Sequence, residues 1–195
     1  MTGAGRATLA LTAVGAAVLV VLAWTGLADA DAGTRGAAVV TLAFVLGGVW
    51  LGTAVVVRRA RTAHRELTAA LPGWSLHCGW ADASLATQLV RSGTWERGLR
   101  PGSPVVIGWS AAGVALWRTG AQPRQLVAAT WSHVDSVTVT RGFAGSTGRP
   151  ALGLDMVGGQ LVVTPCARAN GGVLPASHLQ VQQLVATLRS TRPDV

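Results

Sequence analysis

Long uncharged stretches and short polar ones alternate over the first 57 positions of the chain. Residues 7–27 and 36–57 hold twenty-one and twenty-two residues without a charged side chain. About 20 helical residues, at about 1.5 Å each, cross a hydrocarbon core of about 30 Å. The pattern therefore predicts a hairpin of two transmembrane helices, joined by a polar turn at residues 28–35.

Further along the chain the apolar positions fall into short runs separated by Gly, Pro, Ser or Gln. Such runs predict strands, and the short connections between them favour an antiparallel meander. Gly158 and Gly159 predict a two-residue turn between the last two strands. The predicted strands are residues 104–109, 113–118, 125–131, 134–141, 150–157 and 160–165.

A helical pattern returns at the end of the chain. Ser177 and Gln180 form a capping-box sequence, which predicts a helix that begins after Ser177. The apolar residues that follow have helical spacing, so one face of this helix should pack on the sheet. They are Val181, Leu184, Val185 and Leu188.

The segment between the hairpin and the strands mixes both patterns. Residues 74–80 predict a short strand with Trp74, Leu76 and Cys78 on one face, and Asp82 or Ser84 caps a short helix after it. The predicted domains are a transmembrane hairpin with a basic end at 1–65, a connecting α/β segment at 66–103 and a mostly antiparallel β domain at 104–195. The predicted fold class is α+β.

Charge sets the predicted topology. Arg58, Arg59, Arg61 and Arg65 follow the second span, Arg6 precedes the first, and the turn between them carries one Arg beside two Asp. Because Lys and Arg near span ends are retained in the cytoplasm, both termini are predicted to be cytoplasmic, in a two-span protein of the cell membrane.

The predicted membrane-interface residues are these four arginines and Trp24, near the outer end of the first span. The arginines should hold the start of a helix over residues 58–71 along the membrane surface. Cleavage of a signal peptide at Ala28-Asp29-Ala30 is the alternative for the first span, although its apolar stretch is longer than a signal sequence needs.

The remaining charge and the cysteines exclude several classes. Beyond Arg65, ten arginines are spread among six acidic residues without a basic cluster, which argues against nucleic-acid binding. Cys78 and Cys166 lie far apart with no CxxC motif, so neither a disulfide framework nor a zinc site is predicted. A single disulfide between the two stays open at this point.

Candidate chemistry is sparse. Ser132, His133 and Asp135 are close in sequence, but on a strand His133 and Asp135 share a face that Ser132 does not, which is a poor arrangement for a triad. We predict no catalytic, cofactor or metal site and no small-molecule substrate. Arg141 and Arg149 flank a glycine-rich loop that either contacts anionic lipid headgroups or is a solvated hairpin tip.

Four stretches carry a resemblance to a known group. They are SAAGVALWR, ATWSHVDSVTV, LGLDMVGGQLVVTP and the closing helix, which together cover roughly residues 104–190. Strands followed by one amphipathic helix resemble a pleckstrin-homology-like domain, and with two N-terminal spans the chain resembles uncharacterised actinobacterial membrane proteins. That group has seven strands, of which six are clear here, and residues 74–80 are a candidate for the seventh.

The resemblance and the anchor together imply a non-enzymatic interaction module at the cytoplasmic face of the membrane. Its expected partners are membrane lipids and an unknown protein. The alternative functions are a sensor of anionic lipid surfaces and, less favoured, an enzyme of unknown class. Salt dependence separates the first two, since binding to charged lipid weakens with ionic strength.

Overall fold

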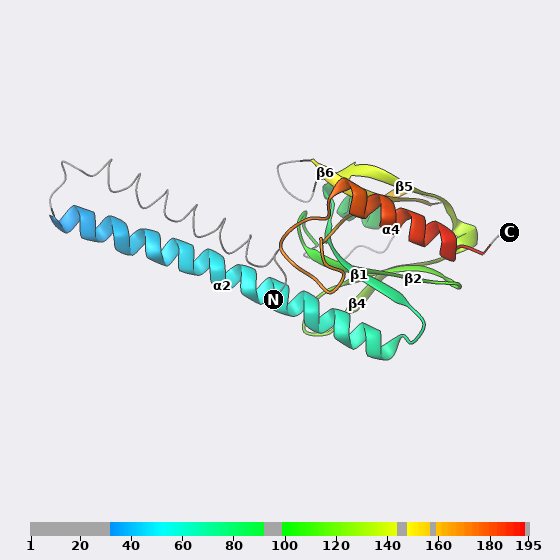
Figure 1. Ribbon diagram of the computed structural model, residues 1–195, viewed down its shortest axis with the longest axis horizontal. Helices are drawn as coiled ribbons and strands as arrows, with labels where there is room; N and C mark the ends of the chain where they lie inside the picture. The colour runs from blue at the N-terminus through cyan, green and yellow to red at the C-terminus, as the bar shows by residue number, and fades with distance from the viewer. Residues whose placement is uncertain (1–31, 92–98, 144–147, 157–158, 194–195) are drawn as a thin grey trace. The chain divides into compact units, whose positions relative to one another are not determined.

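The computed structural model describes residues 32–91, 99–143, 148–156 and 159–193 (Figure 1). The chain divides into two compact units, Met1–Ala54 and Val55–Val195. The predicted first span at residues 7–27, with Trp24, lies outside the described residues. The same holds for the predicted cleavage site at residues 28–30.

One long helix, α2 (Ala32–Ala70), opens the described chain. From Ala37 onward it is long and apolar enough to cross a membrane, with a mean hydropathy of 2.2 over its most apolar 18 residues. Large apolar side chains such as Phe44 and Trp50 are 77% and 67% exposed, as suits a helix whose solvent is lipid. The helix predicted over residues 58–71 is present, and residues 58–70 are the last turns of α2.

Seven strands follow, each close to its predicted range. They are β1 (Ser75–Ala81), β2 (Pro104–Ser110), β3 (Gly113–Arg118), β4 (Arg124–Thr130), β5 (Val134–Gly142), β6 (Arg149–Met156) and β7 (Gly159–Pro165). Residues 74–80 thus supply a seventh strand, β1. The turn before β7 differs slightly from prediction, because Gly159 pairs with Met156 and belongs to the strand.

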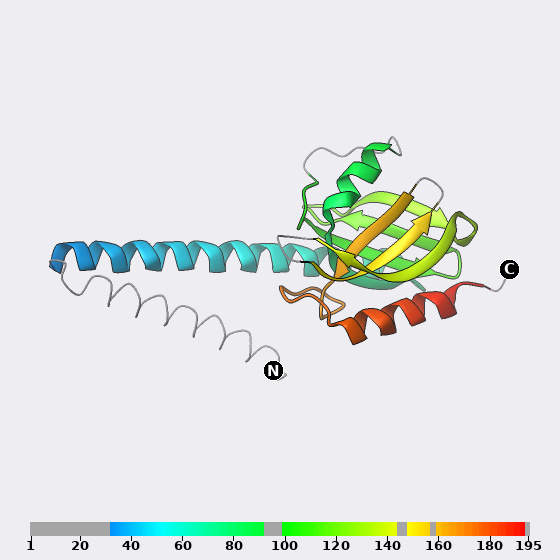
Figure 2. The same ribbon diagram turned by 90° about the horizontal axis from the view of Figure 1, so that it is seen from above.

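All seven strands form one antiparallel sheet in the order β4-β3-β2-β1-β7-β6-β5. The sheet is two meanders, joined where β1 pairs with β7. Figure 2 shows the sheet curling around a core, so it has an inner and an outer face and two free edges, at β4 and β5. The predicted α+β class and antiparallel arrangement are confirmed.

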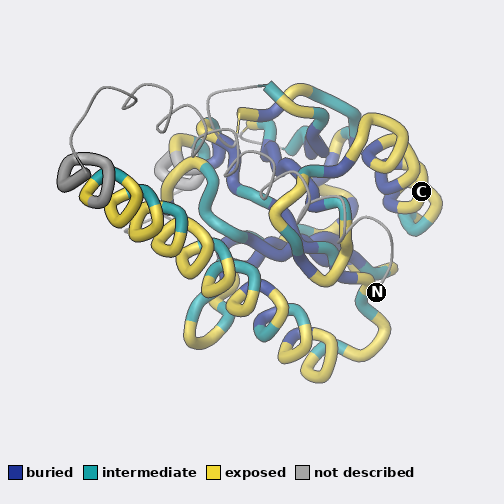
Figure 3. Tube along the Cα trace, turned by 60° about the vertical axis from the view of Figure 1, so that its left-hand side comes forward, coloured by how far each residue is buried: buried dark blue, intermediate teal, exposed yellow. Residues whose placement is uncertain are grey.

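The inner face is closed by α4 (His178–Thr191) and by α3 (Ala83–Arg91). The predicted stripe of α4 is buried, with Val181 and Leu188 fully inaccessible, and it packs on inner-face residues such as Ile107 and Leu152. Figure 3 shows the buried strands beside a helix that is exposed on its outer side. The space left inside is a cavity of about 10 Å³, on the order of one water molecule, so the inner face is a packed core.

The outer face is covered by the last turns of α2. Ala60, Ala63 and Leu67 are spaced to share one side of the helix, and all are buried against a second cluster of side chains. The sheet residues of this cluster are Leu76, Cys78, Val106, Ala115, Trp117 and Cys166. Residues 55–70 are therefore part of the β domain as well as part of α2.

Local sequence explains where the helices begin. Ser177 Oγ accepts the Gln180 N–H at 3.3 Å and Gln180 Oε1 accepts the Ser177 N–H at 2.8 Å, which confirms the capping box of α4. Asp82 caps α3, where its Oδ1 accepts both the N–H and the hydroxyl of Ser84. Its other oxygen accepts the N–H of Phe143, which ties α3 to the end of β5.

Candidate functional site

The four predicted interface arginines of α2 lie on the side of the helix that the sheet leaves free. Arg58, Arg59, Arg61 and Arg65 are all exposed. The residues between them that are buried are small, Ala60 and Ala63, and the helix approaches the sheet through them. The basic end of α2 is thus accessible to a charged surface while its other face is packed.

Two neighbouring residues of β1, Cys78 and His77, carry titratable side chains near this part of α2. Cys78 Sγ donates to the Ala60 carbonyl at 3.8 Å, and His77 Nε2 donates to the Cys166 carbonyl at 2.8 Å. The Cys166 N–H donates to the Cys78 carbonyl at 2.9 Å, yet the two sulfur atoms form no disulfide. The disulfide left open by the sequence is therefore absent from the structure.

Burial controls the pKa values of these groups. It raises the pKa of the Cys78 thiol to about 12 and that of the Cys166 thiol to about 11, so neither forms the reactive thiolate readily. Burial also lowers the pKa of His77, against the opposing effect of its bond to the Cys166 carbonyl. Among the described residues, no three His, Cys, Asp or Glu side chains are grouped to hold a metal ion.

Ser132 and His133 do not lie on a strand, although their faces were compared above as if they did. Residues 131–133 form a short 3₁₀ helix, η1 (Trp131–His133), between β4 and β5. Ser132 Oγ is 3.4 Å from His133 Nδ1, but the same nitrogen is 2.8 Å from Thr130 Oγ1, and all three side chains are exposed. This is a solvent-facing polar cluster at a turn, and Asp135 is on the following strand.

Three tryptophans of the strand region are buried. Trp109, Trp117 and Trp131 are 4%, 6% and 3% exposed. Trp131 Nε1 donates to the Ser110 carbonyl at 2.8 Å, which fixes the β2–β3 turn next to η1. Trp117 meets Trp74 edge to face at 5.7 Å under α2. All three tryptophans are therefore part of the packed clusters of the domain.

The β5 edge of the sheet is covered by side chains from the end of α4. Arg189 donates twice to the Val137 carbonyl, from Nε at 2.9 Å and from Nη2 at 2.7 Å. Arg192 donates to the Asp135 carbonyl at 3.2 Å. Both carbonyls belong to β5, whose pairing with β6 is irregular at residue 135, so these bonds occupy part of the edge that another strand would use.

The other edge of the sheet, within the part of the chain that the structure describes, is β4. β4 pairs with β3 on one side, and no described strand pairs with it on the other. Gln125, Ala128 and Thr130 are exposed along it, and only Leu126 is fully buried. Unpaired N–H and C=O groups of an edge strand are a template for pairing with another chain. This edge is the candidate binding site.

The sequence pattern did not predict which strands lie at the two edges of the sheet. The order of the strands decides which two are at the edges, and local pattern does not reveal that order. One signal was present in the sequence, namely Arg189 and Arg192 at the end of a helix whose other face is apolar. What they contact depends on residues more than fifty positions earlier in the chain.

Comparison with known proteins adds no assignment. The chain matches no protein-family model, no curated protein and no solved structure.

Proposed function

We propose that this protein is a membrane-anchored interaction module whose β domain binds an extended segment of a partner protein along the open edge of β4. The domain acts by binding rather than by catalysis. The bound segment adds an eighth strand, with main-chain hydrogen bonds giving affinity and alternate side chains giving specificity.

The difference between the two sheet edges carries this proposal. Both edges belong to one sheet, and at the β5 edge Arg189 and Arg192 donate hydrogen bonds to the carbonyls of Val137 and Asp135. Soluble proteins block exposed edges because open ones pair with other chains. An edge left open in the same domain is a surface available for a specific partner.

The anchor is α2, continued by the sequence that precedes it. Its length and hydropathy from Ala37 support one span. The uncharged stretch at residues 7–27 supports a second span, and the arginine bias favours a cytoplasmic location for both termini. The partner segment would then belong to a cytoplasmic protein or to the cytoplasmic part of a membrane protein.

The layout of the domain supports a pleckstrin-homology-like assignment as part of the proposal. Seven antiparallel strands in two meanders, closed by one C-terminal amphipathic helix, are the arrangement that the sequence resemblance implied. Such a domain in an actinobacterial two-span protein is a scaffold for recognition. Fold alone does not assign a function, so the β4 edge remains the specific argument.

Quantitative affinity capture from membranes tests the proposed edge. The full chain, an Ala128→Lys variant and a Gln182→Lys variant are each captured from detergent-solubilised cells and their co-purifying proteins compared. Ala128 is exposed on β4, and Gln182 is an equally exposed position on α4 that serves as the control. We expect at least one protein to be lost with Ala128→Lys and retained with Gln182→Lys. If the two variants capture the same proteins as the unmodified chain, the edge is not the binding site.

Thiol labelling of intact cells tests the anchor and its orientation. A cysteine at Gly33, near the predicted outer turn, should react with an impermeant reagent added outside. A cysteine at Ala112, in the exposed β2–β3 turn, should react only after the cells are opened. The buried native thiols provide a low background, since burial raises the pKa of both. The reverse pattern of labelling would reject the cytoplasmic orientation.

A further inference from the structure

A short hairpin loop projects from the sheet between β7 and α4. The loop, residues 167–174, is closed by the bond from the Ala167 N–H to the Leu174 carbonyl at 2.8 Å and by a bridge between Cys166 and Pro175. The Cys78 N–H donates to the Ala169 carbonyl at 2.7 Å, which fixes the loop to β1. The loop is therefore held in place by backbone bonds on both sides.

Three of the four exposed large apolar side chains of the described domain beyond α2 are in this loop or in the helix turn beside it. Within the described part of Val55–Val195, those beyond α2 are Phe143, Val173, Leu174 and Leu179, at 47%, 48%, 46% and 63% exposed. Val173 and Leu174 are in the loop itself, and Leu179 is in the first turn of α4. Gln180 Nε2 donates to the Ala167 carbonyl at 3.4 Å and so keeps that turn beside the loop. Phe143 follows β5, beside β7, since a Cβ on Gly142 would lie 2.8 Å from Thr164 Oγ1.

The loop also touches α2 where its apolar sequence ends. Gly171 has φ +98°, and a Cβ placed on it would lie 3.3 Å from Ala60 Cβ and 3.7 Å from Arg61 Cγ. Val57 is the last residue of the uncharged stretch. Ala60 is three residues further, about 4.5 Å along a helix axis. If Val57 marks the edge of the hydrocarbon, the loop lies at the depth of the lipid headgroups.

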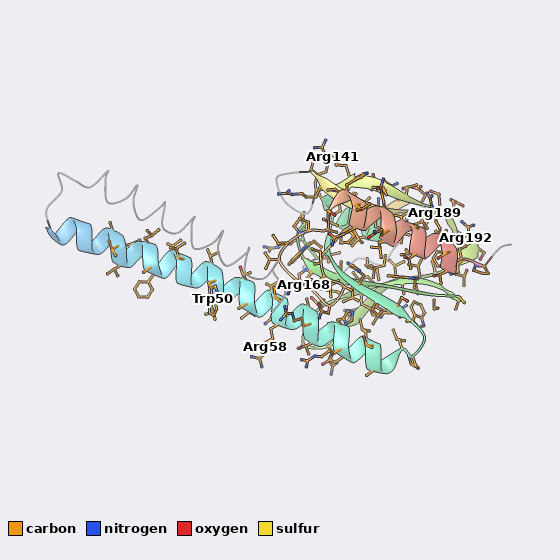
Figure 4. All side chains as sticks on the ribbon, in the orientation of Figure 1. Trp50, Arg58, Arg141, Arg168, Arg189 and Arg192 are labelled. Carbon is orange, nitrogen blue, oxygen red and sulfur yellow. The ribbon has the colours of Figure 1, made fainter. Side chains whose placement is uncertain are left out.

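Charge at this end of the domain is basic. Arg168 in the loop and Arg141 and Arg149 at the ends of β5 and β6 are exposed. Figures 1 and 2 show the β5–β6 end, the loop and the α2 residues next to it at one end of the domain. Figure 4 shows Arg141 and Arg168 at that end, with Arg189 and Arg192 toward the other.

The described acidic residues of the strands lie elsewhere. Asp135 is near the start of β5 and Asp155 near the end of β6, so both are at the far ends of the strands that carry Arg141 and Arg149. Asp82 is near the basic end, but it is 5% exposed and its oxygens accept backbone N–H groups. The basic end thus presents arginines and apolar side chains together.

We propose that this end of the domain rests on the bilayer that anchors the chain, with Val173, Leu174 and Leu179 in the interfacial region. The occupant is an anionic lipid surface. Arg58, Arg61 and Arg168 contact its headgroups, because exposed basic residues at this depth are attracted to anionic lipid and apolar neighbours add burial. The inference rests on the membrane anchor of the proposed function and adds a second contact that fixes the orientation of the domain.

Spin-label accessibility in reconstituted full-length protein tests this contact. Nitroxides are attached at Val173→Cys and, as a control, at Ala112→Cys in the β2–β3 turn, which Trp131 places near the start of β5 at the other end of the domain. The protein is inserted in vesicles of phosphatidylcholine with phosphatidylglycerol. The label at 173 should be severalfold more accessible to oxygen than to a polar nickel chelate, and the label at 112 should show the reverse. An Arg168→Glu change should lower the oxygen-to-nickel ratio at 173 in these vesicles.

The outcomes separate this inference from the anchor on which it rests. Flotation of the vesicles after a high-salt wash shows whether the chain is anchored. A chain that floats while its label at 173 is as open to nickel as the label at 112 overturns the inference and leaves the anchor intact. A chain that does not float removes the anchor and the inference with it. A third outcome would identify a protein contact. In that case nickel reaches the label at 173 in vesicles, and the label becomes shielded from both reagents only when membrane extract is added. This outcome also overturns the inference.

Discussion

The two edges of the sheet are formed by similar strands but differ in what their backbone groups bond to. At β5, the guanidinium groups of Arg189 and Arg192 donate hydrogen bonds to the carbonyls of Val137 and Asp135. At β4, exposed side chains such as Gln125 and Ala128 flank a backbone that pairs with β3 on one side and with no described strand on the other. Helix α4 therefore has two roles in the fold. Its apolar face closes the core, and the arginines at its C-terminal end cover the β5 edge.

The largest effect should come from removing α4 from the sheet. Leu184 lies in the buried stripe of α4, 9% exposed, and Leu184→Asp would place an unpaired charge in the core. The cost should be about 5 kcal/mol, close to the total stability of a small domain. Circular dichroism and urea unfolding of residues 55–195 measure it, and we expect a largely unfolded domain. Gln182→Asp, on the exposed side of the same helix, should retain the native spectrum.

A pair of proline substitutions separates the two sides of β4. Neighbouring N–H groups of a strand point in opposite directions, so one of Ala128→Pro and Ala129→Pro removes a bond to β3 and the other removes an outward N–H. The first should cost about 2–3 kcal/mol, because an acceptor on β3 is left unpaired, and the second less than about 1 kcal/mol. Urea unfolding compares the two. Equal large losses would mean that β4 is engaged on both sides and is not an open edge.

Opening the β5 edge should have a smaller effect on stability and a visible effect on association. Arg189→Ala removes both bonds to the Val137 carbonyl and should cost about 1–2 kcal/mol. The exposed edge should then allow concentration-dependent dimers, detected by analytical ultracentrifugation. Arg189→Lys keeps the charge but not the two-donor geometry. Its stability should therefore lie between those of the unmodified chain and Arg189→Ala. A monomeric Arg189→Ala variant at all concentrations would show that the arginine does not protect the edge.

The smallest effect concerns the bonds that hold the β5 side of the sheet together. Asp155 on β6 accepts from the Ser136 hydroxyl on β5 and, at 2.7 Å, from Gln160 Nε2 on β7. Asp155→Ala should lower the free energy of unfolding by about 1 kcal/mol, since the lost bonds are partly exposed. Binding at β4 should be unchanged. A loss of captured partner with this variant would argue that the binding surface lies on the β5 side.

Much of the fold could be predicted because its signals are local. The alternation of apolar residues located the strands, and the Ser177–Gln180 box located the start of α4 to the residue. The last turns of α2 were assigned to the membrane surface because four arginines dominate their composition. Ala60 and Ala63 gave no signal of burial, since alanine is common in both exposed and packed helices.

Less of the candidate site could be predicted, because its features are non-local. The exposed arginines of α2 were readable in sequence, whereas the bonds of Arg189 and Arg192 join residues 52 and 57 positions apart. The position of β4 at an edge follows from the pairing of β1 with β7, two strands that are far apart in the sequence. Residue 131 was predicted at the end of one strand and residues 132–133 between two strands. Residues 131–133 instead form a short 3₁₀ helix, because the chain needs a turn there to pass from one edge of the sheet to the other.

Site-specific photo-crosslinking in living cells tests the β4 edge most directly. A benzophenone amino acid is placed at Gln125, at Ala128 or, as the control, at Gln182 of the full-length chain, all exposed positions. We predict that irradiation gives an adduct of the same mass from both β4 positions and none from Gln182. The absence of an adduct at β4, or an equal adduct from Gln182, would contradict the claim that this edge is where the domain binds its partner.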